Sequence, residues 1–134
     1  SEIVMAFEAS QPLKLSLVAA ADLSSSQFLF VKVDTNGKAA LCTAATDRPV
    51  GVLQNKPVSG QTAEIVVAGV TKIVTAAGLT AGVLIGTDNA SKAASKTPGT
   101  DTTNYVVGQL LATTGGAGVV GSAIVNCASP ARAA

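Results

Sequence analysis

Very few side chains in this sequence could carry out chemistry. The chain of 134 residues contains no histidine, and its eight Asp and Glu residues are spread singly along it. Histidine is the commonest general base and the commonest metal ligand, so the usual central residue of many catalytic sites is missing. A hydrolase built on paired carboxylates would also need substrate contacts, and only 3% of the residues are aromatic. We therefore predict that the protein is not an enzyme and uses no cofactor.

The two cysteines, Cys42 and Cys127, are too few for a structural zinc site. Both lie in strand-like runs, where a free thiol packs as a small apolar side chain. A disulfide between them would close most of the chain, but such bridges are rare in proteins made in the cytosol. We interpret them as buried thiols, with a disulfide as the alternative.

Two short motifs imitate ligand sites. Gly116, Gly118 and Gly121 match the spacing G-x-G-x-x-G, but a strand-like run follows them and the chain ends at residue 134, too early for a dinucleotide-binding unit. Asp34-Thr35-Asn36-Gly37 resembles part of a calcium loop, but no bidentate glutamate follows at the required distance. Both motifs are better explained as turns, and we predict no metal site.

Small and uncharged side chains must cover most of the surface. Charged residues make up 13% of the chain, against about 25% in a typical soluble domain. Few charges keep copies apart, so we expect this surface to meet other protein in an assembly. The net charge is +1 and the basic residues are scattered, which argues against a nucleic-acid partner. No apolar stretch reaches about 18 residues, so we expect no membrane partner.

The apolar runs are short and rich in β-branched residues, as in strands of a half-buried sheet. Turn residues separate them at close intervals, and residues 17–23 are the only plausible short helix. The Asn36-Gly37 pair should close a hairpin, and Gly69 should mark a bulge or bend between two strands. An all-β domain follows, with predicted strands at residues 28–33, 38–42, 49–54, 62–69, 70–75, 83–85, 105–112 and 119–127.

Three segments lie outside this strand pattern. Residues 87–104 are polar and lack periodicity, so we predict one long exposed loop. Residues 128–134 carry no packing signal and are predicted to form a C-terminal tail. Residues 1–26 are interrupted by Pro12 and are interpreted as an extended N-terminal arm, with an ordinary first strand of the domain as the alternative. Residues 27–127 would then form the domain itself.

Residues 13–24 imitate a signal peptide, with Lys14 followed by a short apolar run. Glu2 and Glu8 precede this run, and the run is too short for a good match. We therefore expect synthesis in the cytoplasm without export.

A series of short motifs resembles the small capsid decoration, or head cement, proteins of tailed bacteriophages. The motifs are DRPVGVL at 47–53, AEIVVAGV at 63–70, GVLIG at 82–86 and VVGQLL at 106–111, followed by the apolar strand at 119–127. The resemblance implies a small β-barrel or β-tulip domain on the outer surface of the virion capsid, assembled in the host cytoplasm. It also implies two partners, the major capsid protein and further copies of the chain in a homotrimer.

The function that this resemblance implies is cementing of the expanded head. A small protein that binds only the mature lattice stabilises it by mass action. An extended arm could add backbone hydrogen bonds to an exposed strand edge while its apolar side chains bury surface, at about 25 cal/mol per Å². The predicted interface residues, toward the capsid or a neighbouring subunit, are Ile3, Val4, Phe7, Leu13, Leu15 and Leu17.

A second interpretation is a non-enzymatic surface-binding module of the β-sandwich type. In that case the loop at residues 87–104 would contact glycans or a host surface. Sugar-binding platforms usually employ Trp or Tyr, and here Tyr105 stands alone in a chain without tryptophan. The sequence therefore favours the capsid protein over the adhesion module.

Overall fold

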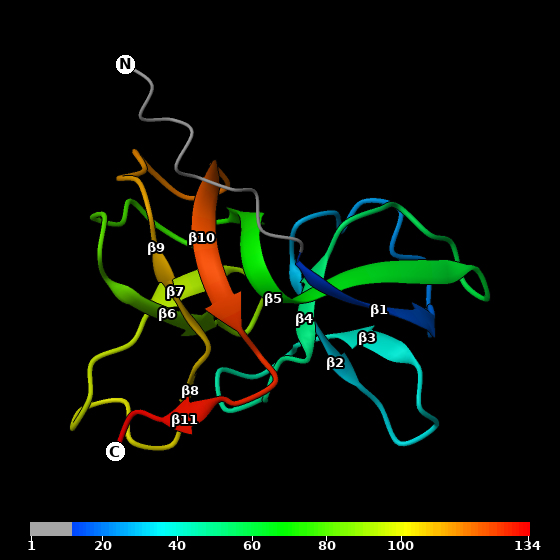
Figure 1. Cartoon of the computed structure of the whole chain (residues 1–134), viewed down its shortest axis with the longest axis horizontal. Helices are drawn as coiled ribbons and strands as arrows, with labels where there is room; N and C mark the ends of the chain where they lie inside the picture. The colour runs from blue at the N-terminus through cyan, green and yellow to red at the C-terminus, as the bar shows by residue number, and fades with distance from the viewer. Residues whose placement is uncertain (1–11) are drawn as a thin grey trace.

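The structure is a computed structural model that describes residues 12–134. Within this part of the chain it contains eleven β-strands and no helix (Figure 1). The predicted all-β fold is confirmed, and the short helix considered for residues 17–23 does not form. The strands are β1 (Leu13–Val18), β2 (Phe30–Val33), β3 (Ala39–Leu41), β4 (Gly51–Leu53), β5 (Thr62–Val74), β6 (Leu84–Thr87), β7 (Ala93–Ser95), β8 (Tyr105–Val106), β9 (Gly108–Leu110), β10 (Val120–Asn126) and β11 (Ala131–Arg132).

Nine of the strands form one curled, half-barrel sheet. Its order is β3-β2-β4-β5-β10-β9-β6-β7, and β1 joins β5 outside this path. All the pairs between named strands are antiparallel, which suits a chain whose strands are joined by short turns. The remaining two strands, β8 and β11, form a separate pair at the C-terminal end (Figure 1).

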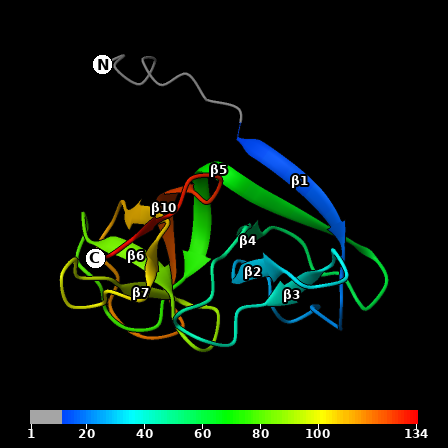
Figure 2. The same ribbon diagram turned by 90° about the horizontal axis from the view of Figure 1, so that it is seen from below.

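The long strand β5 connects two parts of the sheet. Its first half pairs with β1 and β4, and its second half pairs with β10 along residues 68–74. Gly69 has a φ of +130°, a value that residues with a side chain rarely adopt, and the two halves of β5 run in different directions (Figure 2). The bend predicted at Gly69 is confirmed, but one continuous strand passes through it because the ladder with β10 is unbroken there.

Each half of β5 belongs to its own lobe. The first lobe contains β1 to β4 with residues 62–67 of β5, and the second contains β6, β7, β9 and β10 with residues 68–74. Isolated parallel bridges bring the outer strand of each lobe back toward its start, between Ala19 and Ala39 in the first and between Thr75 and Ala93 in the second. The sheet therefore curls at both ends around a common central strand.

Both lobes bury apolar side chains on their inner faces. The core of the first lobe contains Leu23, Val31, Leu53 and Ile65, with Leu15 and Leu17 packed against it. A second cluster fills the other lobe and continues into the junction between the two. Its larger members are Phe30, Val52, Val66, Ile73, Ile85, Val107, Leu110 and Val125.

The hairpin predicted at Asp34-Thr35-Asn36-Gly37 is confirmed. Gly37 has a φ of +76°, and the Asp34 amide donates to the Lys38 carbonyl across the turn at 2.9 Å. The Asp34 carboxylate accepts hydrogen bonds from the amides of Asn36 and Lys38, each at 2.8 Å. The Asp34 carboxylate, which would be a ligand in a calcium loop, is therefore bound by backbone amides of its own turn.

Three segments differ from their predictions because they pair with other parts of the chain. Residues 87–104 contain β7, whose Ala-Ala-Ser sequence has little strand preference but pairs with β6. The predicted strand at 105–112 divides into β8 and β9. The predicted tail contains β11, which pairs with β8 and places Arg132 over the Tyr105 ring at 5.0 Å.

Residues 12–134 include no helix with the length and apolar character needed to cross a membrane.

Candidate interaction surface

The six predicted interface residues fall into three groups. Ile3, Val4 and Phe7 lie outside the described residues. Leu15 and Leu17 lie on the inner side of β1 and pack against the cores of the same chain. Leu13 remains 56% exposed. Of the three leucines in β1, Leu13 is therefore the one that offers substantial surface to a partner.

A change of register separates Leu13 from the other two leucines. Leu13 lies opposite Ala68 of β5, whereas the next residue, Lys14, lies opposite Val66. Val67 is left without a partner on β1, as in a β-bulge, and this interrupts the regular alternation. The sequence pattern placed all three leucines on one face because a bulge in the opposite strand leaves no mark in β1 itself.

The outer face of the second lobe carries exposed apolar side chains among polar ones such as Lys72 and Ser122. Val70 on β5 and Ile124 on β10 form a cross-strand pair, and they are 58% and 46% exposed. Val120, near the start of β10, is 50% exposed, and Leu84 lies on β6 beyond the exposed Gln109. We call these outward side chains, Val70, Leu84, Val120 and Ile124, the apolar face.

A groove of about 530 Å³ lies at one end of this face, where Leu84 and Ile124 are among its lining residues. Its walls combine exposed apolar side chains with positions that have little or no side chain, including Gly69 and Gly108. At Gly108 the strands approach closely, because an added Cβ would meet the Ile124 carbonyl oxygen and lie 3.0 Å from the Val125 Cα. Leu84, Val106 and Ile124 supply apolar side chains around the groove.

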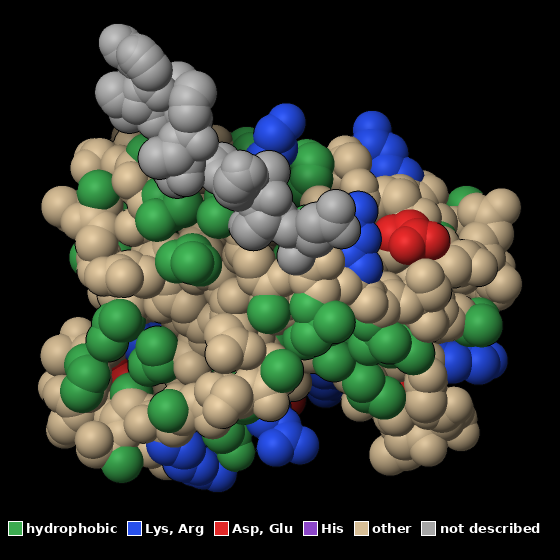
Figure 3. Space-filling model, viewed as in Figure 1, with side chains coloured by type: hydrophobic (Ala, Val, Ile, Leu, Met, Phe, Trp, Pro, Cys, Tyr) green, Lys and Arg blue, Asp and Glu red, His purple; other side chains and the backbone are tan. Residues whose placement is uncertain are grey.

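On the first lobe, the outward residues where β1 pairs with β5 are mostly polar, with the exposed Val18 as an exception. Lys14 and Ser16 point outward from β1, and Glu64 points outward from the paired part of β5. The Ser16 hydroxyl donates to the Glu64 carboxylate at 3.2 Å. Figure 3 shows a carboxylate beside amino groups over β1 and β5 on the right, and it shows apolar side chains both over β9 and β10 on the left and below β1, over β2 and β3. The polar surface of the first lobe is therefore confined to the region where β1 pairs with β5.

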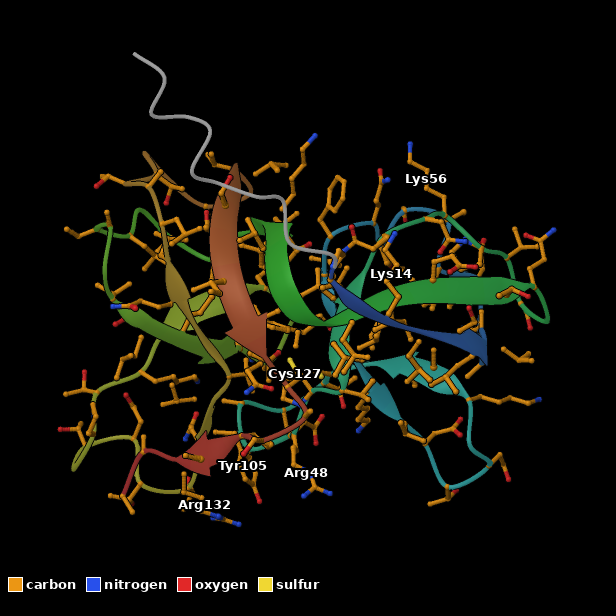
Figure 4. All side chains as sticks on the ribbon, viewed as in Figure 1. Lys14, Arg48, Lys56, Tyr105, Cys127 and Arg132 are labelled. Carbon is orange, nitrogen blue, oxygen red and sulfur yellow. The ribbon has the colours of Figure 1, made fainter. Side chains whose placement is uncertain are left out.

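Both cysteines are buried free thiols, which confirms the interpretation made from the sequence. Burial raises the pKa of the Cys42 thiol to about 12, and the nearby Asp47 charge acts in the same direction. Burial and the neighbouring Cys42 likewise raise the pKa of Cys127 to about 12. Cys127 lies at the end of β10, where it also lines a second cavity of about 380 Å³ (Figure 4). Because thiolates are the reactive form, neither side chain is activated as a nucleophile.

The polar segment at residues 87–104 is tied to the C-terminal strand region. The Gly99 amide donates to the Ala133 carbonyl at 2.8 Å, and the Ala133 amide donates to the Asn104 carbonyl at 3.0 Å. The Lys96 ammonium donates to the Asn104 side-chain oxygen at 2.7 Å, and burial lowers the pKa of Lys96. Tyr105 and Arg132 lie next to each other at the edge of this region (Figure 4).

Across residues 12–134, no three Cys, Asp or Glu side chains come together in a way that could hold a metal ion.

The apolar face was missed at the sequence level, although β10 contains a signal for it. Its sequence VGSAIVN places Ala123 and Val125 inward and Val120 and Ile124 outward, so both faces of the strand carry apolar residues. A strand with one solvated face normally alternates apolar and polar residues. Apolar residues on both faces of β10 therefore indicate a second contact surface.

Comparisons with known proteins give a structural likeness without a sequence match. No protein family model matches the chain, and no curated protein sequence matches it. Among solved structures, the chain is similar to the head fiber gp8.5 N base of bacteriophage phi29. The TM-score is 0.58 at 12% identity, and the match covers 87% of this chain and 96% of the other. The two proteins therefore share a fold.

Proposed function

We propose that the protein is a structural component of a bacteriophage head. The observation that carries this proposal is the likeness to the phi29 head fiber N base, which extends over 87% of the chain. A match of this extent includes both lobes and is not confined to one hairpin. The scarcity of charge and the apolar face support a protein that works by contact with other protein.

The proposed partner is the major capsid protein on the outer surface of the expanded head. Binding to the expanded lattice alone stabilises that lattice, by about 2.7 kcal/mol per site when the free protein is at 100 times its Kd. In this way many small contacts would cement the shell. We further propose that the protein binds as a homotrimer, because each copy has an apolar face and few charges to repel its neighbours.

The proposed capsid contact combines the N-terminal residues with the apolar face. Ile3, Val4 and Phe7 would bury apolar area against the capsid protein, and the exposed Leu13 continues this surface into β1. Leu15 and Leu17 would act indirectly, because their packing against the core holds β1 in place. Ile124 and its neighbours on the apolar face would complete the contact.

The experiment mixes the purified protein with expanded capsids that lack it, prepared from the phage that encodes the chain. Capsid-bound protein is measured by sedimentation over a range of concentrations, and the Tm of the capsids is measured by calorimetry. We expect binding to saturate at a fixed number of copies per capsid and to raise the capsid Tm. Sedimentation of the free protein tests for the trimer separately. Absence of saturable binding, together with binding to a glycan array, would instead support the adhesion module.

A further inference from the structure

The chain enters the described part of the structure beside the groove on the apolar face. Pro12, the first described residue, lies against Gly69, since an added Cβ at Gly69 would be 3.0 Å from the Pro12 Cβ. Gly69 lines the groove, and so does Ala68, which pairs with Leu13. Residues 1–11 therefore join the described chain directly beside the groove.

The sequence of residues 1–11 suits an apolar groove. Ile3, Val4, Met5, Ala6 and Phe7 are five consecutive apolar residues, and Glu2 and Glu8 stand on either side of them. No charged side chain lines the groove among the described residues, and Lys72, the charged outward residue in the second half of β5, lies over the Phe28 ring at 5.7 Å. The apolar character of residues 3–7 therefore matches the groove.

The residues between Phe7 and Pro12 give the segment reach along the groove from its attachment at Pro12. Five residue steps separate Phe7 from Pro12, and an extended chain covers about 3.3 Å per residue, or roughly 16 Å in all. A tether of this length holds the segment at an effective concentration in the millimolar range. If the segment binds with an intrinsic Kd of about 100 µM, an effective concentration of about 1 mM gives roughly ten molecules with the groove filled for each one with the groove empty.

We propose that residues 3–7 bind in the groove on the second lobe of the same chain. Phe7 and Ile3 supply the largest side chains of the segment, and Ile124 and Leu84 supply the apolar wall that receives them. The bound segment would cover Leu84 and Ile124 in the free protein. The proposal concerns the free protein and does not depend on capsid binding.

The test measures competition between the tethered segment and the same peptide added in solution. A fluorescent peptide of sequence SEIVMAFEASQ is titrated with the full-length protein and with the full-length double variant Ile3→Ser and Phe7→Ser, and fluorescence anisotropy is recorded. We expect the double variant to bind the peptide at least tenfold more tightly, because its own segment no longer occupies the groove. Equal binding by the two proteins, or no binding to the double variant, would overturn the proposal.

Matched charge substitutions identify the binding site. Ile124→Lys, added to the double variant, should weaken peptide binding at least tenfold, whereas Val18→Lys should change it less than twofold. Val18 is 43% exposed and lies on β1 of the first lobe, so it is close to Ile124 in exposure and in strand context. If Ile124→Lys does not fold, as judged by circular dichroism, Leu84→Lys replaces it, because Leu84 also lines the groove and is 36% exposed. Tight binding that survives the groove substitution would contradict the proposed site.

A dilution series separates the same chain from a second copy as the occupant. Competition within one chain does not depend on protein concentration. The apparent Kd of the added peptide for the wild-type protein should therefore be the same at all protein concentrations. Competition that disappears on dilution, together with dissociation of an oligomer in sedimentation, would show that the segment of another copy fills the groove. That result would overturn the assignment to the same chain.

Discussion

The two halves of β5 belong to one strand, yet they face solvent in different ways. In the first half, the outward residues include Thr62 and Glu64, and Glu64 is hydrogen bonded to Ser16. In the second half, the outward Val70 packs beside Ile124 of β10. The inward residues of both halves are buried, and apart from Thr71 they are apolar. The two halves are therefore alike on their inner faces, and they differ on the outer face, where Val70 takes the place of a polar residue.

The strands next to β5 follow the same division. The outward residues of β1 begin with Lys14 and Ser16, and the outward residues of β10 include Val120 and Ile124. Exposed apolar side chains that occur singly are normal, but a contiguous group on neighbouring strands marks an interaction site. Val70 and Ile124 form a cross-strand pair of this kind, and the exposed Ser122 and Lys72 separate Val120 from them. Val18 lies on β1 beside polar outward residues of the first lobe.

The largest effect is expected from the inner faces, where the two lobes should behave alike. Ile65 and Ile73 are fully buried, one in the core of each lobe. Replacing either with alanine leaves a cavity and should lower the free energy of unfolding by about 2–5 kcal/mol. Ile124→Ala, on the outer face, should cost less than about 1 kcal/mol. Urea unfolding measures all three variants, and a large loss for Ile124→Ala would show that the apolar face is part of the core.

The bend that separates the two halves should be the next most sensitive feature. Gly69→Ala places a side chain at a φ of +130° and 3.0 Å from the Pro12 Cβ, so we expect a loss of about 1–3 kcal/mol. Gly60 is the control, since its φ is +86° but an added Cβ would meet no atom within 4 Å. Gly60→Ala should therefore cost about 1 kcal/mol. Equal losses for the two variants would mean that the contact with Pro12 contributes nothing to the bend.

Local sequence signals predicted the parts of the fold that are determined locally. The Asn36-Gly37 turn, the bend at Gly69 and the β-branched strands depend on the conformations that their own residues prefer. β7 and β11 were missed because Ala-Ala-Ser and Ala-Arg form strands only through pairing with β6 and β8. Their partners lie elsewhere in the chain, and a single sequence does not say which segments meet.

The candidate surface was harder to predict for a related reason. Alternation in β1 indicates one apolar face, but the bulge opposite Leu13 is created by β5 and changes which leucine is exposed. In β10 the sequence shows apolar residues on both faces, but only the sheet order shows that Ile124 faces outward beside Val70. Ile3, Val4 and Phe7 stay predictions, because they lie outside the described residues.

Substitutions on the outer faces of the two lobes should affect capsid binding differently. The expected effect is smaller than that of the core substitutions and larger than that of the ion pair. Ile124→Lys places a charge in the proposed contact and should weaken binding to expanded capsids about tenfold, equivalent to about 1.4 kcal/mol. Val18→Lys adds the same charge to the first lobe and should change binding less than twofold. Sedimentation of capsids with increasing amounts of each variant gives both affinities. If Val18→Lys is the more harmful variant, the contact surface lies on the first lobe.

The smallest expected effect concerns the ion pair of the first lobe. The Lys32 ammonium lies 3.1 Å from the Asp47 carboxylate, which also accepts hydrogen bonds from the amides of Thr43 and Ala44. Partial burial raises the pKa of Asp47, but Lys32 and the two amides outweigh it, so the pKa lies below its ordinary value. Loss of the charge in Asp47→Asn should cost about 1 kcal/mol at neutral pH. Glu64→Gln, on the exposed face, should change stability by less than about 0.5 kcal/mol.

The sign of the pH dependence follows from the lowered pKa of Asp47. A carboxylate with a lower pKa in the folded state contributes stability above the pKa of the unfolded chain, about 4, and loses it as the pH falls through the folded value. Between pH 5 and pH 3 the wild-type protein should therefore lose more stability than Asp47→Asn. Urea unfolding at both pH values measures the difference, and the apolar face should contribute nothing to it because none of its four side chains titrates. Parallel losses in the two proteins would show that the Lys32 pair does not stabilise the first lobe.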